Sequence, residues 1–226
     1  MLAGLATRRY TAAAESVGEA VEQAASATSR SAVLRRFLRE TKTALAELLA
    51  RELSPRDIKV LMIDVELVTE HCCVVALAIT ADGTKAPVGL WEGSTENKTV
   101  VTHLLADLVA RGPDATDELL VVIDGAKALS AAVKAVFGAN AAIQRCTVHK
   151  RRNVTEHLPE SERGWVDLNL ARALNNPDAA AGLRDAKALA TALERKHPGA
   201  AASLREGTEE LFTVARLGIT APWPNP

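Results

Sequence analysis

Two aspartates that each close an apolar stretch carry the most evident chemistry in this sequence. Asp64 ends the stretch Ile58–Asp64, and Asp124 follows Leu119–Ile123. A strand that ends on an aspartate holds its carboxylate at the rim of a rigid sheet. Mg²⁺ binds one or two such carboxylates together with water and phosphate oxygens. Two of them on neighbouring strands could hold a metal pair about 3.5–4 Å apart, as in two-metal phosphoryl transfer. The alternative is that both are ordinary strand-end or turn residues.

Glu66 lies two residues after Asp64. If the strand continues past Asp64, the two side chains point to the same face, because side chains alternate along a strand. Glu66 could then serve as an auxiliary metal ligand. The competing interpretation is an exposed acid at the end of a strand.

Cys146 and His149 form a second pair, spaced i, i+3, which places them on one face of a helix. A structural zinc ion needs four ligands, and this pair supplies only two. His71, Cys72 and Cys73 could supply others, but adjacent cysteines in a strand point to opposite faces. A Cys-His nucleophile would need a third, orienting residue, which is not evident. We therefore interpret the pair as a buried cysteine and a polar histidine beside the acidic site.

Basic residues bracket the Cys-His pair. They are Arg145, Lys150, Arg151 and Arg152. A cluster of this kind neutralises phosphates without reading base sequence. A solvated helix face is the competing interpretation.

Residues 1–56 have the composition of a helical arm. A helix is expected over Ser16–Ala25, followed by a turn and a second helix from about Ala32 to Leu48. Basic residues on or near the polar face of the second helix, which would contact DNA, include Arg30, Arg35 and Arg36. The pattern resembles a helix-turn-helix DNA-binding unit. The alternative is an ordinary amphipathic helix with a solvated charged face.

The elements that must position the two aspartates follow from the spacing of apolar side chains. Three strand-length stretches come first, and Asp82-Gly83 between the second and third is a strong hairpin signal. Helical spacing then alternates with two short strands, which is typical of βαβ crossovers. The strands are expected over 58–64, 72–80, 85–91, 119–123 and 141–144, with helices from Glu96, over 126–137 and from Cys146. The order β-β-β-α-β-α-β predicts an α/β fold with a mixed sheet.

Helices return after Leu158, with segments expected over 182–196 and 201–217 and a break at His197-Pro198-Gly199. The last six residues alternate with proline, which is incompatible with a helix or a central strand. The chain therefore divides into a helical arm (1–56), a catalytic core (57–158), a helical segment (159–218) and a disordered tail (219–226).

The composition excludes several classes of protein. The chain has 226 residues, of which 48% are hydrophobic and 24% charged, with a net charge of -1, so a basic surface must be local. Three cysteines do not make a disulfide scaffold and fit a reducing cytoplasm. No signal peptide and no membrane span are expected, because the sequence shows no charged start followed by an apolar run and no apolar run of about 18 residues.

The motifs around the aspartates resemble those of mutator-type transposases of bacterial insertion sequences. The similar segments are Met62–Asp64, Glu70–Leu77, Val122–Lys127, Gln144–Asn153 and Pro198–Gly207. They occur in the family's order, and the similarity extends from the helical arm to about residue 220. Several separate motifs in the right order make this a specific resemblance.

The resemblance implies an RNase H-like core that cuts and joins DNA with three acids and two metal ions, usually Mg²⁺. It implies that Asp64 is the first acid and Asp124 the second, and that Cys146 and His149 form the family's Cys-x-x-His motif near the site. The implied partners are element-end and target DNA, with a homo-oligomer assembled on the DNA. The implied location is the bacterial cytoplasm, in association with the nucleoid.

Two departures from the family pattern bear on activity. Val65 follows Asp64 where the family usually has glycine. The family's third acid is a glutamate in an Asn-x-x-Glu-Ser motif after the helical segment, and the chain stops before it. Glu209 and Glu210 are poor substitutes because they lie within the helical segment. We therefore expect a truncated copy that is inactive alone, because two-metal chemistry needs its full ligand set.

Two other functions remain open from the sequence. A non-catalytic DNA-binding remnant could occupy element ends and inhibit an intact transposase. A metal-dependent phosphohydrolase that acts on small molecules would also place an aspartate at a strand end. Such enzymes expect Asp-x-Asp-x-Thr, whereas the corresponding positions here are Asp64, Glu66 and Val68.

Overall fold

The computed structural model describes residues 30–54, 56–68, 71–93, 98–112 and 118–219. The chain forms two compact units, residues 1–51 and 52–226. The described part of the first unit is helix α2, Arg30–Ala50. This confirms the helix expected from Ala32 to Leu48. The helix expected over 16–25 lies outside the described residues, so the helix-turn-helix stays a prediction.

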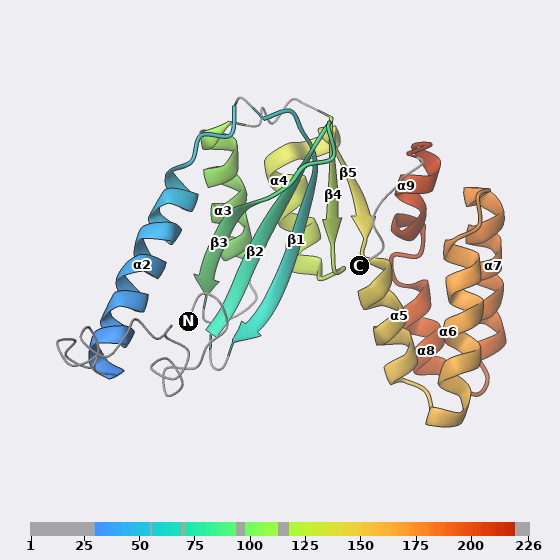
Figure 1. Cartoon of the computed structure of the whole chain (residues 1–226). Helices are drawn as coiled ribbons and strands as arrows, with labels where there is room; N and C mark the ends of the chain where they lie inside the picture. Colours follow the sequence, from blue (N-terminus) through green and yellow to red (C-terminus); the bar gives the residue numbers. More distant parts are fainter. Residues whose placement is uncertain (1–29, 55, 69–70, 94–97, 113–117, 220–226) are drawn as a thin grey trace, which may run out of the picture. The chain divides into compact units, whose positions relative to one another are not determined.

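A five-stranded mixed sheet is the centre of the second unit, and its strand order is β3-β2-β1-β4-β5 (Figure 1). The strands are β1 (Ile58–Val68), β2 (His71–Thr80), β3 (Lys85–Gly93), β4 (Leu119–Ile123) and β5 (Ala141–Arg145). Strands β1 to β3 form an antiparallel meander, and β4 and β5 run parallel to β1. The predicted order β-β-β-α-β-α-β and the predicted mixed sheet are therefore confirmed.

Strand β1 is longer than expected. Asp64 was expected to end it, but β1 continues to Val68 because β2 pairs with it as far as Val68↔His71. The parallel neighbour β4 stops earlier, at Ile123. Asp64 therefore lies where the parallel pairing ends, while the strand itself continues.

Helices α3 (Lys98–Arg111) and α4 (Lys127–Phe137) pack on one face of the sheet (Figure 1). Successive side chains of β1 point to opposite faces of the sheet, and those on one face pack against these helices. Leu61 and Ile63 join the core with Leu104 of α3 and Leu129 of α4, whereas Val60 packs in a smaller cluster on the other side. Strand β4 is buried on both faces for most of its length, which agrees with its continuous apolar run.

The remaining helices form a segment with an apolar core of its own. They are α5 (Thr147–Glu156), α6 (Glu160–Leu174), α7 (Ala179–Leu193), α8 (Pro198–Arg205), the 3₁₀ turn η4 (Glu209–Phe212) and α9 (Thr213–Arg216). Leu170, Leu193 and Leu204 are fully or nearly fully buried in that core. Asp178 caps α7 by accepting hydrogen bonds from the amides of Ala180 and Ala181.

The helix expected over 201–217 is wrong. Helix α8 begins at Pro198, so the expected break is a helix start, and α8 ends at Arg205. The chain then turns at Gly207, whose φ of +64° favours glycine. The reason for this break is tertiary, because Gly207 lies directly against the side chain of Arg145.

Within the part of the chain that the structure describes, no helix has both the length and the apolar character needed to cross a bilayer.

Candidate functional site

Asp64 and Asp124 lie at neighbouring positions on one edge of the sheet. The parallel register pairs Ile63 of β1 with Ile123, the last residue of β4, and each aspartate is the next residue in the sequence. The parallel register thus places the two residues at neighbouring positions of the sheet edge, as the order of the strands in the sequence indicated. Their role as metal ligands stays a prediction.

Each carboxylate is held by one oxygen. Oδ1 of Asp64 accepts a hydrogen bond from the amide of Val65 (3.0 Å), and Oδ1 of Asp124 accepts one from the amide of Ala126 (2.8 Å). Gly125 permits the second contact by turning the chain at a φ of +104°. Among the described residues, Oδ2 of neither aspartate has a hydrogen bond, and the Asp64 side chain is 45% exposed. One oxygen of each carboxylate can therefore reach a solvated cation.

These donors suit a hard divalent cation, which prefers carboxylate oxygens and keeps several water ligands. The described residues do not bring three or more His, Cys, Asp or Glu side chains into a metal-holding group. The remaining ligands would be water and phosphate oxygens. Glu66, on the same strand, is exposed.

Cys146 and His149 extend the site along the same edge. The amide of Cys146 donates to the carbonyl of Ile123 (2.6 Å), so Cys146 lies beside the end of β4, and it is the residue that precedes α5. Its side chain is half-buried, so the expected full burial is not found. His149 lies in the first turn of α5, and its Nδ1 is 4.0 Å from Oδ1 of Asp64. That Nδ1 is buried and has no hydrogen-bond partner.

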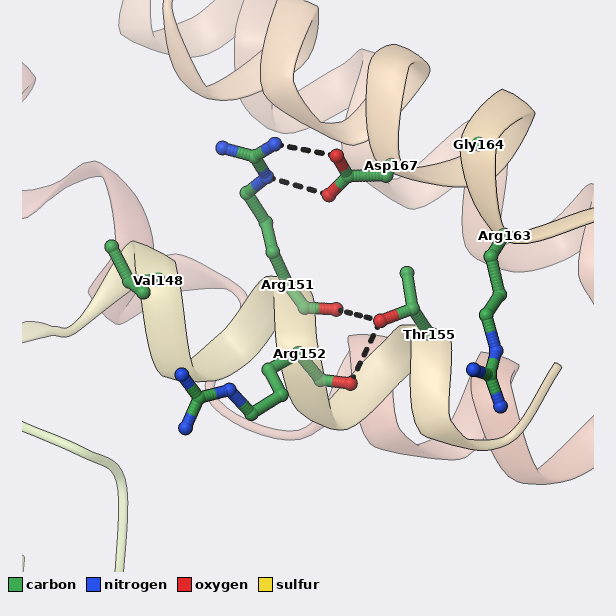
Figure 2. Close-up of a pocket in the computed structure, with 7 residues that line it drawn as sticks. All are labelled: Val148, Arg151, Arg152, Thr155, Arg163, Gly164 and Asp167. Carbon is green, nitrogen blue, oxygen red and sulfur yellow. Dashed lines mark hydrogen bonds and ion pairs between the residues drawn. The ribbon is translucent and has the colours of Figure 1, made fainter. Parts of the chain in front are cut away.

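The expected basic cluster separates into two pairs. Arg151 and Arg152 line a groove of about 460 Å³ between α5 and α6 (Figure 2). Arg151 makes two hydrogen bonds to Asp167, of 2.7 and 2.6 Å, and this contact holds the pKa of that carboxyl below its usual range. Arg152 is exposed beside the groove. Arg163, from the first turn of α6, adds a third guanidinium to the lining.

Arg145 and Lys150 are buried, at 7% and 2% exposed. The Lys150 amine donates to the carbonyls of Ser203 (2.5 Å) and Glu206 (2.8 Å), at the end of α8. Burial, with a smaller contribution from the charge of Arg145, lowers the pKa of Lys150 to about 8. These two side chains bind internal partners, so we do not include them in the DNA-binding surface proposed below.

Comparison with known proteins identifies the family. The sequence model described as "Transposase, Mutator family" matches residues 2–220. The chain belongs to this family. The resemblance to this family that the sequence motifs indicated is therefore confirmed.

Individual insertion-sequence transposases are similar to this member of the mutator family. The transposase for ISRM3 of Rhizobium meliloti is 33% identical over 155 residues, which cover 68% of the chain and 38% of that protein. A probable ISRM3-like transposase of Sinorhizobium fredii gives the same values. The IS256 transposase in Tn4001 of Staphylococcus aureus is 29% identical over 163 residues, 67% of the chain and 38% of that protein. The matched part of this chain thus spans about two fifths of those relatives.

The basic residues expected on the arm of this mutator-family chain belong to α2. Arg35 is exposed, and Arg36 forms an ion pair with Glu40, with 2.7 Å between Nε and Oε1. The side chain of Arg30 lies outside the described residues. Their contact with DNA stays a prediction.

Two lining residues of the groove, Arg163 and Asp167, were not predicted from the sequence. The available signal was their spacing of four residues on a helix that begins after Pro159, which puts them on one face. Which face of α6 packs against α5 depends on the tertiary structure, and the sequence pattern of α6 does not predict it.

Proposed function

We propose that this chain acts as an insertion-sequence transposase that binds element-end DNA and uses divalent cations, with Mg²⁺ as the physiological ion, at Asp64 and Asp124. The observation that carries the proposal is the parallel register, which sets the two aspartates at neighbouring positions of one sheet edge. The order β3-β2-β1-β4-β5, with an antiparallel meander and two parallel strands, supports an RNase H-like core. The relatives are transposases by name, and transposases of this kind generally use divalent metal.

Asp64 and Asp124 would hold the cation through the oxygens that their backbone hydrogen bonds leave free. A bound divalent cation stabilises the charge that develops on a phosphate during phosphoryl transfer. The chain itself supplies rigidity, because backbone amides hold both carboxylates, that of Val65 in β1 for Asp64 and that of Ala126 at the start of α4 for Asp124. His149, whose Nδ1 faces Asp64, limits the space on the α5 side of the site.

Among the described residues, two aspartates lie at this edge, and no third acidic or other metal-ligating side chain joins them. We therefore propose that this chain alone binds metal and DNA but does not complete strand transfer. A DNA-binding remnant that competes with an intact transposase is the alternative that this observation favours. Metal binding at the two aspartates distinguishes it from the main proposal.

The groove between α5 and α6 is the proposed track for the DNA backbone (Figure 2). Arg152 lies one helical turn beyond His149 on α5, so a phosphate backbone over the groove would lead toward the aspartates. Asp167 neutralises and orients Arg151, and Glu160 forms an ion pair with Arg163 (2.9 Å). Among the described residues, Arg152 is the exposed arginine of the lining that has no carboxylate partner. Such contacts position DNA without reading its sequence.

Replacing either aspartate by asparagine should weaken Mn²⁺ binding. We expect Asp124→Asn and Asp64→Asn each to raise the Kd for Mn²⁺ by about tenfold or more, since even the partners of metal ligands typically contribute that much. The measurement is titration of free Mn²⁺ by electron paramagnetic resonance. Asp178→Asn is the matched control, because Asp178 is a remote helix cap and asparagine caps equally well. Absence of Mn²⁺ binding by the wild type would refute the metal proposal and leave the DNA-binding alternative.

Neutralising the groove should weaken DNA binding uniformly across sequences. We expect the double variant Arg152→Gln/Arg163→Gln to lower affinity for duplex DNA and to reduce the salt slope of log K by about 1, mainly through Arg152, because Glu160 already balances the charge of Arg163. Fluorescence anisotropy at several salt concentrations measures both. The control is Arg172→Gln, an exposed arginine two and a half turns along α6 and so on the opposite side. An unchanged salt slope in the double variant would place the DNA elsewhere.

A further inference from the structure

The side chain of Arg145 lies between two glycine turns. A methyl group on Gly125 would be 2.6 Å from the guanidinium carbon of Arg145, and one on Gly207 would be 2.4 Å from it. Real Cβ atoms essentially never approach other atoms so closely, so both positions require glycine while Arg145 stays in place. Both glycines also have positive φ, of +104° and +64°. The guanidinium therefore fills the space between the turn after β4 and the turn after α8.

Charged groups surround this contact. Nε of Arg145 is 3.4 Å from Oε2 of Glu210, and Nη1 is 4.0 Å from Oε2 of Glu206. Lys150 approaches from α5 and holds the end of α8 through two carbonyls. The cluster thus pairs two cations from the sheet edge and α5 with two anions from the segment after α8. Arg145 Nε and Glu210 Oε2 are buried and make no hydrogen bond, so this pair is electrostatic.

The turn on the other side of Arg145 belongs to the candidate site. Gly125 separates Asp124 from Ala126, and the amide of Ala126 is the donor that holds the Asp124 carboxylate. Any shift of Arg145 must move Gly125 or open a gap beside it. Arg145 is also the last residue of β5, paired in register with Ile123, the residue that precedes Asp124.

From this geometry we infer that Arg145 is a positioning residue for Asp124, through which the turn at Gly207 fixes the metal-site carboxylate. The inference rests on the proposed function in that Asp124 is taken as a metal ligand. The helical segment then has a role beyond its own stability, because its packing sets the geometry of an aspartate more than 80 residues earlier in the chain. If Arg145 only stabilised the fold, a substitution at Gly207 would not change the position of the Asp124 carboxylate specifically.

The test compares two glycine substitutions in the helical segment of the full chain. Gly207→Ala pushes on Arg145. Gly182→Ala, in α7, meets the backbone carbonyl oxygen of Ala173 at 2.4 Å and the ring of Phe212 in η4 at 2.8 Å, but it does not touch Arg145. Both variants are compared with wild type by amide NMR, Mn²⁺ titration and denaturant unfolding. The unfolding curves show whether the two substitutions cost comparable stability.

We expect Gly207→Ala to shift the amide resonances of Gly125 and Ala126 and to weaken Mn²⁺ binding about threefold to tenfold. We expect Gly182→Ala to change neither, whatever its effect on stability. In an Arg145→Ala background, Gly207→Ala should have no further effect on the Mn²⁺ affinity, because the linking side chain is absent.

The NMR arm separates this inference from the proposed function. If the wild type binds no Mn²⁺, the metal proposal fails, while a shift at Gly125 and Ala126 in Gly207→Ala alone still demonstrates the link. If the amide resonances of Gly125 and Ala126 are as unchanged in Gly207→Ala as in Gly182→Ala, then Arg145 does not couple Gly207 to the turn beside Asp124, and the inference is overturned. Equal effects of Gly207→Ala with and without Arg145 would overturn it as well.

Discussion

Replacing Lys150 by methionine is expected to lower the free energy of unfolding by about 2–4 kcal/mol at pH 7. Lys150 is 2% exposed, and its amine donates to the carbonyls of Ser203 and Glu206. Methionine fills similar volume but leaves both carbonyls at the end of α8 without that donor. It also leaves Glu206 and Glu210 with Arg145 as the remaining cation of the cluster. Denaturant unfolding monitored by circular dichroism measures the loss.

The pH dependence of this difference tests the cause. Burial, and to a smaller extent the charge of Arg145, lowers the pKa of Lys150 from an ordinary 10.5 to about 8, against the opposing effect of Glu206 and Glu210. Between these two pH values the unfolded chain binds the proton and the folded chain does not, so wild-type stability should rise with pH. The difference in the free energy of unfolding between wild type and Lys150→Met should increase by on the order of 2–3 kcal/mol over that pH range.

The control for Lys150 is the same substitution at an exposed lysine of the helical segment. Lys187 forms an ion pair with Glu209 in which both side chains are more than half exposed. Lys187→Met should change stability by less than about 0.5 kcal/mol, because exposed pairs contribute little. Two results would contradict the role of the buried Lys150 amine. One is a loss of stability below about 0.5 kcal/mol in Lys150→Met, and the other is a stability difference from wild type that does not vary between pH 8 and 10.5.

The contrast between Lys150 and its neighbours shows what the sequence could and could not predict. The basic run 150–152 suggested one phosphate-binding cluster. Consecutive residues on a helix differ by about 100° in direction, so three in a row cannot share a face. Lys150 faces α8, while Arg151 and Arg152 face the groove. Helical geometry alone required the separation, but which residue became buried depended on where α8 packs.

The sheet was predictable because its signals are local. The apolar run of β4 and the Asp82-Gly83 turn both act over a few residues, and Asp82 does accept a hydrogen bond from the Thr84 amide. The neighbouring positions of Asp64 and Asp124 followed from the right-handed βαβ rule and the apolar strands that precede each aspartate. The end of β1 was not predictable in this way, because β2 determines it.

The break between α8 and α9 was missed for the opposite reason. The spacing of Leu204, Leu211 and Val214 is compatible with one continuous helix. The structure ends α8 at Arg205 because Lys150 binds the last carbonyls and Arg145 fills the space beside Gly207. Both contacts come from more than 50 residues away in the sequence, so no local pattern records them.

Replacing Gln144 by leucine should detach the end of the helical segment from the sheet edge. Gln144 of β5 is 6% exposed. Its Nε2 donates to the carbonyl of Leu211 (2.9 Å), and its Oε1 accepts from the amide of Val214 (3.0 Å). The described sheet ends at β5, and this amide side chain joins its edge to the segment that covers it. Leucine keeps the volume but removes both bonds.

We expect Gln144→Leu to lower the free energy of unfolding by about 2–4 kcal/mol, since each buried backbone group left unpaired costs about 1–3 kcal/mol. Hydrogen exchange should accelerate most at the amides of residues 211–217, which lose their attachment to β5, and less in α3 and α4 on the other face of the sheet. Thr213 limits the effect, because its hydroxyl donates to the carbonyl of Ile143 (2.7 Å) and keeps one link intact.

Asn169→Leu is the matched control for Gln144→Leu. Asn169 donates to the carbonyl of Trp165 four residues earlier on α6 (2.8 Å), so it also loses a side-chain amide that bonds a backbone carbonyl. That bond lies on the exposed surface, where water replaces it, and the change should stay within about 0.5 kcal/mol. If the two substitutions cost the same, or if exchange at 211–217 is unchanged in Gln144→Leu, then apolar packing alone holds the segment on β5. In that case the packing of Val214 against Val60, Ile79 and Leu120 is what attaches it.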